Sequence, residues 1–201
     1  MIARFVLVLA ATMMTMACSS EAKPLAPFAG FERTPTPLVG ELALPAVEAD
    51  GSETDFTFQA DEGDILLVYF GYTSCPDVCP TTLSDVRRAA DRLGDDAERV
   101  DLAMITIDPL VDTPDIVAGY VSSFLPRAVA LRTLDDDRLR AVADVFGADY
   151  GYTDQDGEQQ VYHTGSLYAI DSSGQLILTW SFGTPIDDLE SDLGRLLKEA
   201  V

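Results

Sequence analysis

The pattern of apolar and polar residues after position 42 predicts alternating strands and helices. Residues 65–71 form a continuous apolar run, which is typical of a strand buried on both faces of a sheet. Residues 100–107, mostly apolar, are predicted to form a second buried strand. Between the two runs, apolar residues recur at helical spacing from Pro80 to the stop signal Gly94, at Leu83, Val86, Ala90 and Leu93. Strand, helix and strand in this order indicate a parallel crossover unit.

Two hairpins are expected, one on each side of this unit in the sequence. Segments 42–44 and 54–58 flank Asp50-Gly51, a dipeptide that favours a tight turn between antiparallel strands. Segments 166–170 and 175–182 flank a second turn at residues 171–174. The sheet is therefore predicted to be mixed, with an N-terminal β-hairpin.

Three further helices are expected from their start and stop signals. Thr113-Pro114 provides an N-cap and a proline at the first helical position, ahead of an apolar face made by Ile116, Val117, Tyr120, Val121 and Phe124. A helix over 136–146 ends at Gly147, and Thr184-Pro185 opens the last helix. The predicted class is α/β, a mixed sheet flanked by helices. Such sheets place their chemistry after the central strands.

The first 41 residues look like an export and anchoring segment. Residues 2–17 are almost wholly apolar but shorter than the roughly 20 residues that span a bilayer, so residues 1–17 are predicted to be a signal peptide. Cys18 follows in a sequence that resembles a lipoprotein cleavage box and is expected to carry the lipid anchor. Thr15 replaces the usual leucine, so ordinary cleavage and an uncleaved anchor remain alternatives. Residues 18–41 are predicted to be a proline-rich tether, and residues 42–201 the folded domain.

Composition limits the classes of partner. The 201 residues, 47% of them hydrophobic, suit one domain, and the formal net charge is −21. Removal of residues 1–17 takes away Arg4 and no acid, so the charge of the remainder becomes −22. This acidity argues against nucleic acid and against membrane docking by charge, and it favours a cationic partner or a saline habitat.

Two cysteines stand where the predicted central strand gives way to a helix. Cys75 and Cys79 are four residues apart, a spacing that on a helix brings Cβ atoms to roughly 5–6 Å. A helix N-terminus stabilises thiolate through its unpaired N–H groups and dipole. The pair is therefore expected to be unusually acidic.

His163 is the only histidine in the sequence, and it stands shortly before the predicted strand 166–170. In a thioredoxin-like arrangement its loop lies against the loop of Cys75 and Cys79. Two thiolates are soft ligands that suit copper(I), and one imidazole would complete a three-coordinate site.

These residues, in their sequence context, resemble the Sco/SenC family of copper chaperones. The resemblance rests on three stretches in the same order, 69–80, 107–114 and 163–171. It implies a thioredoxin-like fold in which Cys75, Cys79 and His163 bind copper(I) or copper(II), with the cysteines also able to form a disulfide. It further implies delivery of copper to the copper A centre of cytochrome c oxidase. The expected partner is that subunit or another copper chaperone.

The resemblance also frames three weaker expectations. Many relatives carry histidine at the position of Ser74 and an acidic residue at the position of Tyr162, so the tuning of the site differs here. Asp108 is expected to support the ligands without touching the metal, and a simple turn role before Pro109 is the alternative. The family role places the protein in the bacterial envelope, anchored to the cytoplasmic membrane and facing the periplasm. Ser19 points to the outer membrane as the alternative.

Other interpretations of the cysteine pair remain. A structural disulfide would constrain little, because the loop it closes is short. A thiol-disulfide oxidoreductase, which would reduce the acceptor's cysteines, is the main alternative, although a three-residue spacer and a histidine opposite favour metal over classical enzyme chemistry. Zinc would need Asp77 or Asp108 as a fourth ligand. The segment 154–157 is interpreted as a turn rather than a calcium loop.

Overall fold

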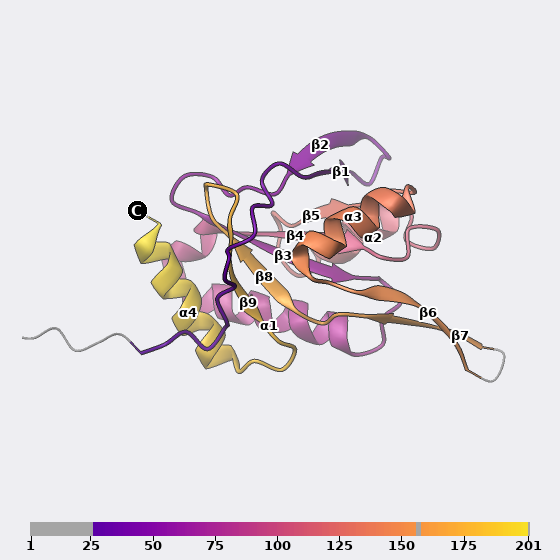
Figure 1. Ribbon diagram of the computed structural model, residues 1–201. Helices are drawn as coiled ribbons and strands as arrows, with labels where there is room; N and C mark the ends of the chain where they lie inside the picture. Colours follow the sequence, from indigo (N-terminus) through magenta and orange to yellow (C-terminus); the bar gives the residue numbers. More distant parts are fainter. Residues whose placement is uncertain (1–25, 156–157, 201) are drawn as a thin grey trace, which may run out of the picture.

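The computed structural model describes residues 26–155 and 158–200 and contains a seven-stranded mixed sheet with helices on both faces (Figure 1). The strands of this sheet are β1 (Ala43–Val47), β2 (Glu53–Thr57), β3 (Ile65–Gly71), β4 (Val100–Thr106), β5 (Val129–Leu131), β8 (Leu167–Ile170) and β9 (Leu176–Trp180). Their spatial order is β2-β1-β5-β4-β3-β8-β9, with β3, β4 and β5 parallel to one another. The predicted α/β class, the N-terminal hairpin and the central crossover unit are confirmed.

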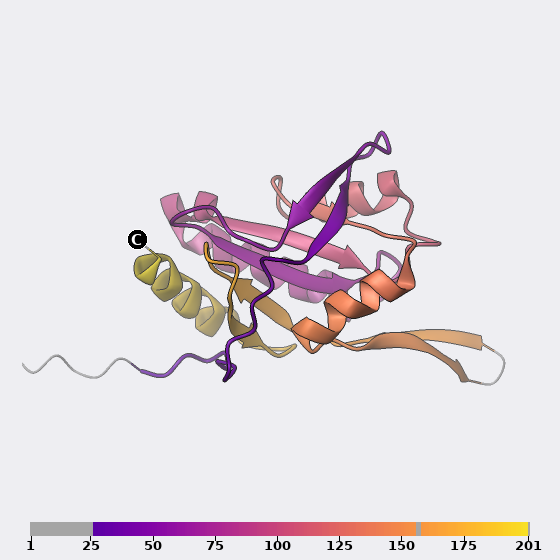
Figure 2. The same cartoon turned by 45° about the horizontal axis from the view of Figure 1, so that its top comes forward.

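In the described part of the chain, four α-helices and one 3-10 helix surround the sheet. They are α1 (Val78–Arg92), η1 (Gly94–Arg99), α2 (Pro114–Ser122), α3 (Asp136–Phe146) and α4 (Ile186–Glu199). Helices α1, α2 and α4 pack on one face of the sheet, and α3 covers the other (Figures 1 and 2). Strand β3 is buried along its whole length because its side chains alternate between these two cores.

A long antiparallel hairpin departs from the main sheet. Strands β6 (Tyr150–Gln155) and β7 (Glu158–His163) pair only with each other among the described residues, and they project beyond the sheet (Figure 2). Neither this hairpin nor β5 is predicted by the sequence pattern. The hairpin has polar residues on both faces, and β5 has three residues, too few for a period to emerge. Helix α1 begins at Val78, two residues before the predicted start, and so includes Cys79 in its first turn.

Residues 26–40, here called the N-terminal strap, run along the outer side of β9. Phe31 forms a β-bridge with Thr179, and Leu38 forms one with Gln175. This part of the expected tether therefore lies against the domain rather than extending away from it. Cys18 and the expected signal peptide lie outside the described residues. No described helix has the length and apolar character needed to cross a bilayer.

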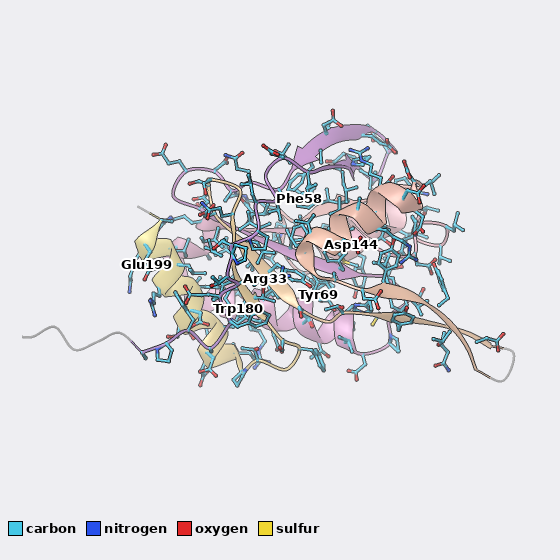
Figure 3. All side chains as sticks on the ribbon, viewed as in Figure 1. Arg33, Phe58, Tyr69, Asp144, Trp180 and Glu199 are labelled. Carbon is cyan, nitrogen blue, oxygen red and sulfur yellow. The ribbon has the colours of Figure 1, made fainter. Side chains whose placement is uncertain are left out.

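A buried carboxylate fastens the start of the strap. Asp192 of α4 is 5% exposed and accepts hydrogen bonds from the backbone N–H groups of Ala29 (3.2 Å) and Gly30 (2.9 Å). It also accepts one from the indole N–H of Trp180 (2.9 Å). Farther along, the guanidinium of Arg33, which is labelled in Figure 3, donates to the carbonyl of Phe146 (2.8 Å) at the end of α3. The strap thus ties α4, β9 and α3 together.

We expect Asp192→Ala to lower the free energy of unfolding by about 2–4 kcal/mol, because it leaves three donors without an acceptor. Urea unfolding measures this loss. Ser191→Ala, at the exposed neighbouring position, is the control and should change little. Equal stabilities of the two variants would contradict the role given to Asp192.

Candidate metal centre

The parallel strands bring the predicted site residues to one end of the sheet. Residue Gly71 at the end of β3 pairs with Thr106 at the end of β4, so the loops that follow them emerge side by side. Strand β8 is antiparallel to β3 and begins there, with Leu167 opposite Tyr69. We call this the site end of the sheet. Chain segments that are far apart in sequence meet at the site end because of this topology.

Cys75, Cys79 and His163 converge at the site end. Their Sγ and ring nitrogen atoms all lie within 4.8 Å of one another, and the Sγ of Cys79 is 3.4 Å from Nε2 of His163. Both cysteines are free thiols. No carboxylate joins this group in the described part of the chain, so the fourth ligand that zinc would need from Asp77 or Asp108 is not in place. The arrangement offers two sulfur donors and one nitrogen donor to a single ion.

The two cysteines differ in local structure. Cys75 lies in the loop before α1, where its N–H donates to the carbonyl of Tyr72 (3.3 Å). Cys79 lies in the first turn of α1, and its N–H donates to the sulfur of Cys75 (3.3 Å). The start of α1 therefore holds the Cys79 sulfur and directs the Cys79 backbone N–H at the Cys75 sulfur. The two thiols are thus held close together before any metal binds.

Burial changes the acid–base behaviour of Cys79 from the sequence expectation. Cys79 is fully buried, and loss of hydration raises the pKa of its thiol from 9.0 to about 12, against the opposing effect of a hydrogen bond with the backbone of Tyr72. The prediction of an unusually acidic pair is therefore wrong for Cys79. In the metal-free protein this sulfur keeps its proton, and a bound cation would have to displace it.

The imidazole of His163 has the orientation of a ligand. Its Nδ1 lies 3.1 Å from the carbonyl oxygen of Thr164, which assigns the proton to Nδ1 and leaves the Nε2 lone pair facing the sulfur of Cys79. The ring is held edge to face by Tyr69 and Tyr72, at centroid distances of 6.0 and 5.8 Å. Burial lowers the pKa of His163, so the neutral form, which binds metals, is favoured.

Gly71 leaves the space that the sulfur of Cys79 occupies. A Cβ atom at this position would lie 2.8 Å from the ring of Tyr69 and 3.0 Å from the Sγ of Cys79. The first contact is shorter than real Cβ atoms make, and the second is tighter than most. The glycine at the end of β3 is therefore needed for the close approach of α1 to the sheet.

Asp112, which sequence reasoning missed, holds the cysteine loop in place. Its carboxylate is fully buried and accepts hydrogen bonds from the backbone N–H of Thr73 (3.1 Å) and from the hydroxyls of Thr73 and Thr106 (2.5 Å each). It thus joins the loop after β3 to the end of β4. The residue lies inside the recognised stretch 107–114, but only tertiary structure shows that its side chain turns inward.

Asp108 lies between the β4 end and the projecting hairpin. Its carboxylate accepts a hydrogen bond from the hydroxyl of Tyr152 (3.1 Å), a residue of the hairpin that ends in His163. Among the described residues, no hydrogen bond joins Asp108 to either cysteine or to the histidine. Support of the ligands by Asp108 therefore stays a prediction, with the hairpin as the connecting element. Ser74 and Tyr162, the two departures from the family pattern, are both exposed.

Fold and site together define a class of protein, an α/β domain that carries a Cys-x3-Cys pair and a distant histidine at the site end of its sheet. The SCO1/SenC family profile matches residues 47–198. The chain therefore belongs to the SCO1/SenC family, and the resemblance noted in the sequence is confirmed.

Individual relatives agree with this assignment. A SCO2-like protein of Rickettsia prowazekii is 33% identical over 123 residues, which are 59% of this chain and 60% of the relative. The human mitochondrial SCO1 homologue is 36% identical over 119 residues, 57% of this chain and 39% of that protein. The matches thus span less than two thirds of the length of these relatives.

Two solved structures share the fold. ScoI of Bradyrhizobium japonicum, solved with copper bound, is 28% identical with a TM-score of 0.63, covering 76% of this chain and 96% of that one. The apo Sco1 protein of Thermus thermophilus is 29% identical with a TM-score of 0.67, covering 85% and 97%. The predicted thioredoxin-like fold is confirmed.

We expect Gly71→Ala to lower the free energy of unfolding by about 1–3 kcal/mol, the usual cost of overpacking a core. The added methyl group would push against the sulfur of Cys79 and Tyr69. Gly119→Ala is the control, since a Cβ there meets nothing and α2 should gain about 0.5–1 kcal/mol. Thermal or urea unfolding of both variants measures these changes in the free energy of unfolding. A Gly71→Ala protein as stable as the wild type would show that the sulfur has room to move.

The metal-free, reduced protein should lose stability above pH 9. The folded pKa of Cys79 lies above its ordinary value of 9.0, so the unfolded chain releases the thiol proton first and gains from each rise in pH up to about 12. The free energy of unfolding then falls by up to about 1.4 kcal/mol per pH unit in this window. For His163 the sign is opposite, with stability lost as pH falls below 6.5.

Urea unfolding across this range, compared with Cys79→Ser, isolates the cysteine contribution, because other groups titrate in both proteins. The alkaline slope should be shallower in the variant. Identical slopes would mean that the Cys79 thiol ionises as easily in the folded protein as in the unfolded chain.

Proposed function

We propose that the protein binds copper through Cys75, Cys79 and His163. The observation that supports this most directly is the convergence of two sulfurs and an imidazole nitrogen within 4.8 Å. Thiolates and imidazole are the donors that copper(I) prefers, and oxygen donors, which harder cations need, are missing from this group among the described residues. The copper-bound ScoI of Bradyrhizobium japonicum is a relative with the same fold.

The bound copper is cargo for delivery, and the intended acceptor is the copper A centre of cytochrome c oxidase. A three-ligand site leaves room for an incoming ligand, so copper can pass to the acceptor by stepwise exchange, one thiolate at a time. Burial of the Cys79 sulfur favours this transfer. Once copper leaves, the buried thiolate has no cation beside it and is destabilised, so the sulfur takes up a proton again. Capture and release are thereby coupled to proton exchange.

The location follows from the first 41 residues. Residues 1–17 act as a signal peptide, Cys18 carries the lipid, and residues up to the strap link the domain to the membrane. The domain then works on the periplasmic side of the bacterial cytoplasmic membrane. These assignments rest on the sequence, since residues 1–25 lie outside the described part of the chain.

A thiol-disulfide oxidoreductase is the second candidate, because the two cysteines are adjacent free thiols. The raised pKa of Cys79 disfavours this reading, since the thiolate is the form that attacks a disulfide. The contact between His163 Nε2 and the Cys79 sulfur places two ligands side by side for a metal ion, whereas thiol-disulfide exchange does not require it. Copper therefore remains the better supported function.

We expect Cys75→Ser, Cys79→Ser and His163→Ala each to weaken copper(I) binding by more than about 100-fold, beyond the range seen when a residue that merely supports a ligand is lost. A competition titration against a coloured copper(I) chelator under reducing conditions measures this affinity. Ser74→Ala, at the exposed position before Cys75, is the matched control and should bind like the wild type.

Weak binding by the wild type, unchanged in the three variants, would end the copper proposal. The oxidoreductase candidate predicts a different result. Exchange with an oxidised partner should then run at full rate in His163→Ala and with metal absent.

A further inference from the structure

Exposed large apolar side chains gather at the site end of the sheet. Nine such side chains are exposed among the described residues, and six of them lie in segments next to the three candidate ligands. These six are Leu110, Val111, Ile116, Tyr152, Tyr162 and Phe182. Of the other three, Leu134 follows β5, which also ends at the site end but lies beyond β4, farther from the strands that carry the ligands. Phe31 and Leu38 belong to the N-terminal strap. Single exposed apolar residues are ordinary, but a cluster around a site marks an interaction surface.

The most exposed member sits on a loop that is firmly held. Leu110 is 83% exposed, the highest value among these residues. The loop around it is fixed by the buried Asp112 carboxylate and by Arg132, whose guanidinium donates to the carbonyls of Pro109 (2.8 Å) and Asp112 (2.8 Å). A loop with its backbone fastened in this way presents Leu110 to solvent in one orientation. Such pre-organisation lowers the entropy cost of binding a partner.

The opposite side of the site carries the aromatic members. Phe182 packs on the backbone beside His163, since a Cβ on Gly165 would lie 3.3 Å from the Cβ of Phe182. Tyr162 directly precedes His163, and its ring lies over Gly151, where a Cβ would be 2.7 Å from its hydroxyl. Tyr152 is tied to Asp108. Apolar and aromatic groups therefore border the ligands from both the β4–α2 loop and the hairpin.

Charge narrows the choice of partner. The chain carries a net charge of −21, and exposed carboxylates lie close to the surface, Asp115 beside Ile116 and Asp77 in the cysteine loop. Arg132, which follows β5 and contacts the loop of Leu110, is turned inward onto backbone carbonyls. A second copy of this chain, or an anionic membrane, would bring like charges together. A protein with an apolar patch bordered by lysine and arginine complements the surface.

We propose that Leu110, Val111, Ile116, Tyr152, Tyr162 and Phe182 form the docking surface for the protein that receives the metal, a partner with its own soft-metal site inside an apolar patch with a basic border. This inference rests on the proposed delivery of copper and specifies how the acceptor is recognised. Docking there brings the acceptor's ligands over Cys75 and His163, so contact and ligand exchange occur at one place. Leu110 is the anchor because it is the most exposed of the six and stands on a firmly held loop.

Leu110→Ser, in the full chain held in detergent and loaded with copper(I), tests the proposal. The probe is the metal-free soluble copper A domain of cytochrome c oxidase, and the readout is the rate of copper transfer to it. We expect the variant to transfer at least about tenfold more slowly than the wild type, equivalent to about 1.4 kcal/mol of docking energy. Leu38→Ser is the matched control, an exposed leucine at the far end of β9, and should transfer like the wild type.

Transfer to a small copper(I) chelator is measured in parallel, and it should be equal in all three proteins because the chelator needs no docking surface. Added salt should slow transfer to the copper A domain, because salt screens the attraction between the acidic protein and a basic border on the partner. Transfer that salt leaves unchanged would contradict the basic border. Equal transfer rates for Leu110→Ser and Leu38→Ser would overturn the docking surface, as would a change in oligomeric state of Leu110→Ser with transfer unaffected. Wild-type protein that binds copper but passes none to the copper A domain would instead refute the proposed delivery, and the docking proposal with it.

Discussion

The exclusion of water from the Cys79 sulfur is the constraint on which the rest of the site depends. This atom lies against the backbone of Gly71 and 3.4 Å from the imidazole of His163, and its burial raises the pKa of the thiol to about 12. A thiolate in such surroundings needs a nearby cation. Without one the sulfur is a protonated, unreactive member of the core, and with one it becomes a strong, soft ligand. The same burial therefore favours the thiolate when a metal ion is bound to it and the neutral thiol when no metal ion is present.

The scaffold holds this arrangement by joining elements that are far apart in sequence. Asp112 links the cysteine loop to the end of β4. The Tyr152–Asp108 hydrogen bond links the β4–α2 loop to the hairpin of His163, and Asp192 fixes the strap against α4. Each link uses a carboxylate that accepts hydrogen bonds from backbone N–H, hydroxyl or indole N–H groups rather than an ion pair. In a chain with 34 acidic and 13 basic residues, such acceptors let acidic side chains hold the fold together without pairing with the less numerous basic ones.

Sequence patterns were sufficient for the parts of the fold whose signals are local. The apolar run at β3, the helical spacing of α1 and the Gly147 stop of α3 predicted elements that the structure contains. The family resemblance pointed to the three residues that converge. Local patterns missed the β6–β7 hairpin, because its residues are polar on both faces, and Asp112, because an inward-facing carboxylate looks like any other turn residue in sequence. They also predicted a lowered pKa for Cys79, whereas its pKa is raised. The helix position is visible in the sequence, but the loss of hydration caused by close packing of Cys79 against the sheet is not.

In the proposed site, two sulfurs and one nitrogen bind a single copper ion, and the apolar side chains around them form the contact surface for an acceptor. X-ray absorption at the copper edge of the copper(I)-loaded protein reports this donor set most directly. The account predicts two sulfur scatterers and one imidazole nitrogen, with the nitrogen signal absent in His163→Ala and one sulfur lost in Cys79→Ser. A spectrum dominated by oxygen or nitrogen donors, or one that these substitutions leave unchanged, would contradict it.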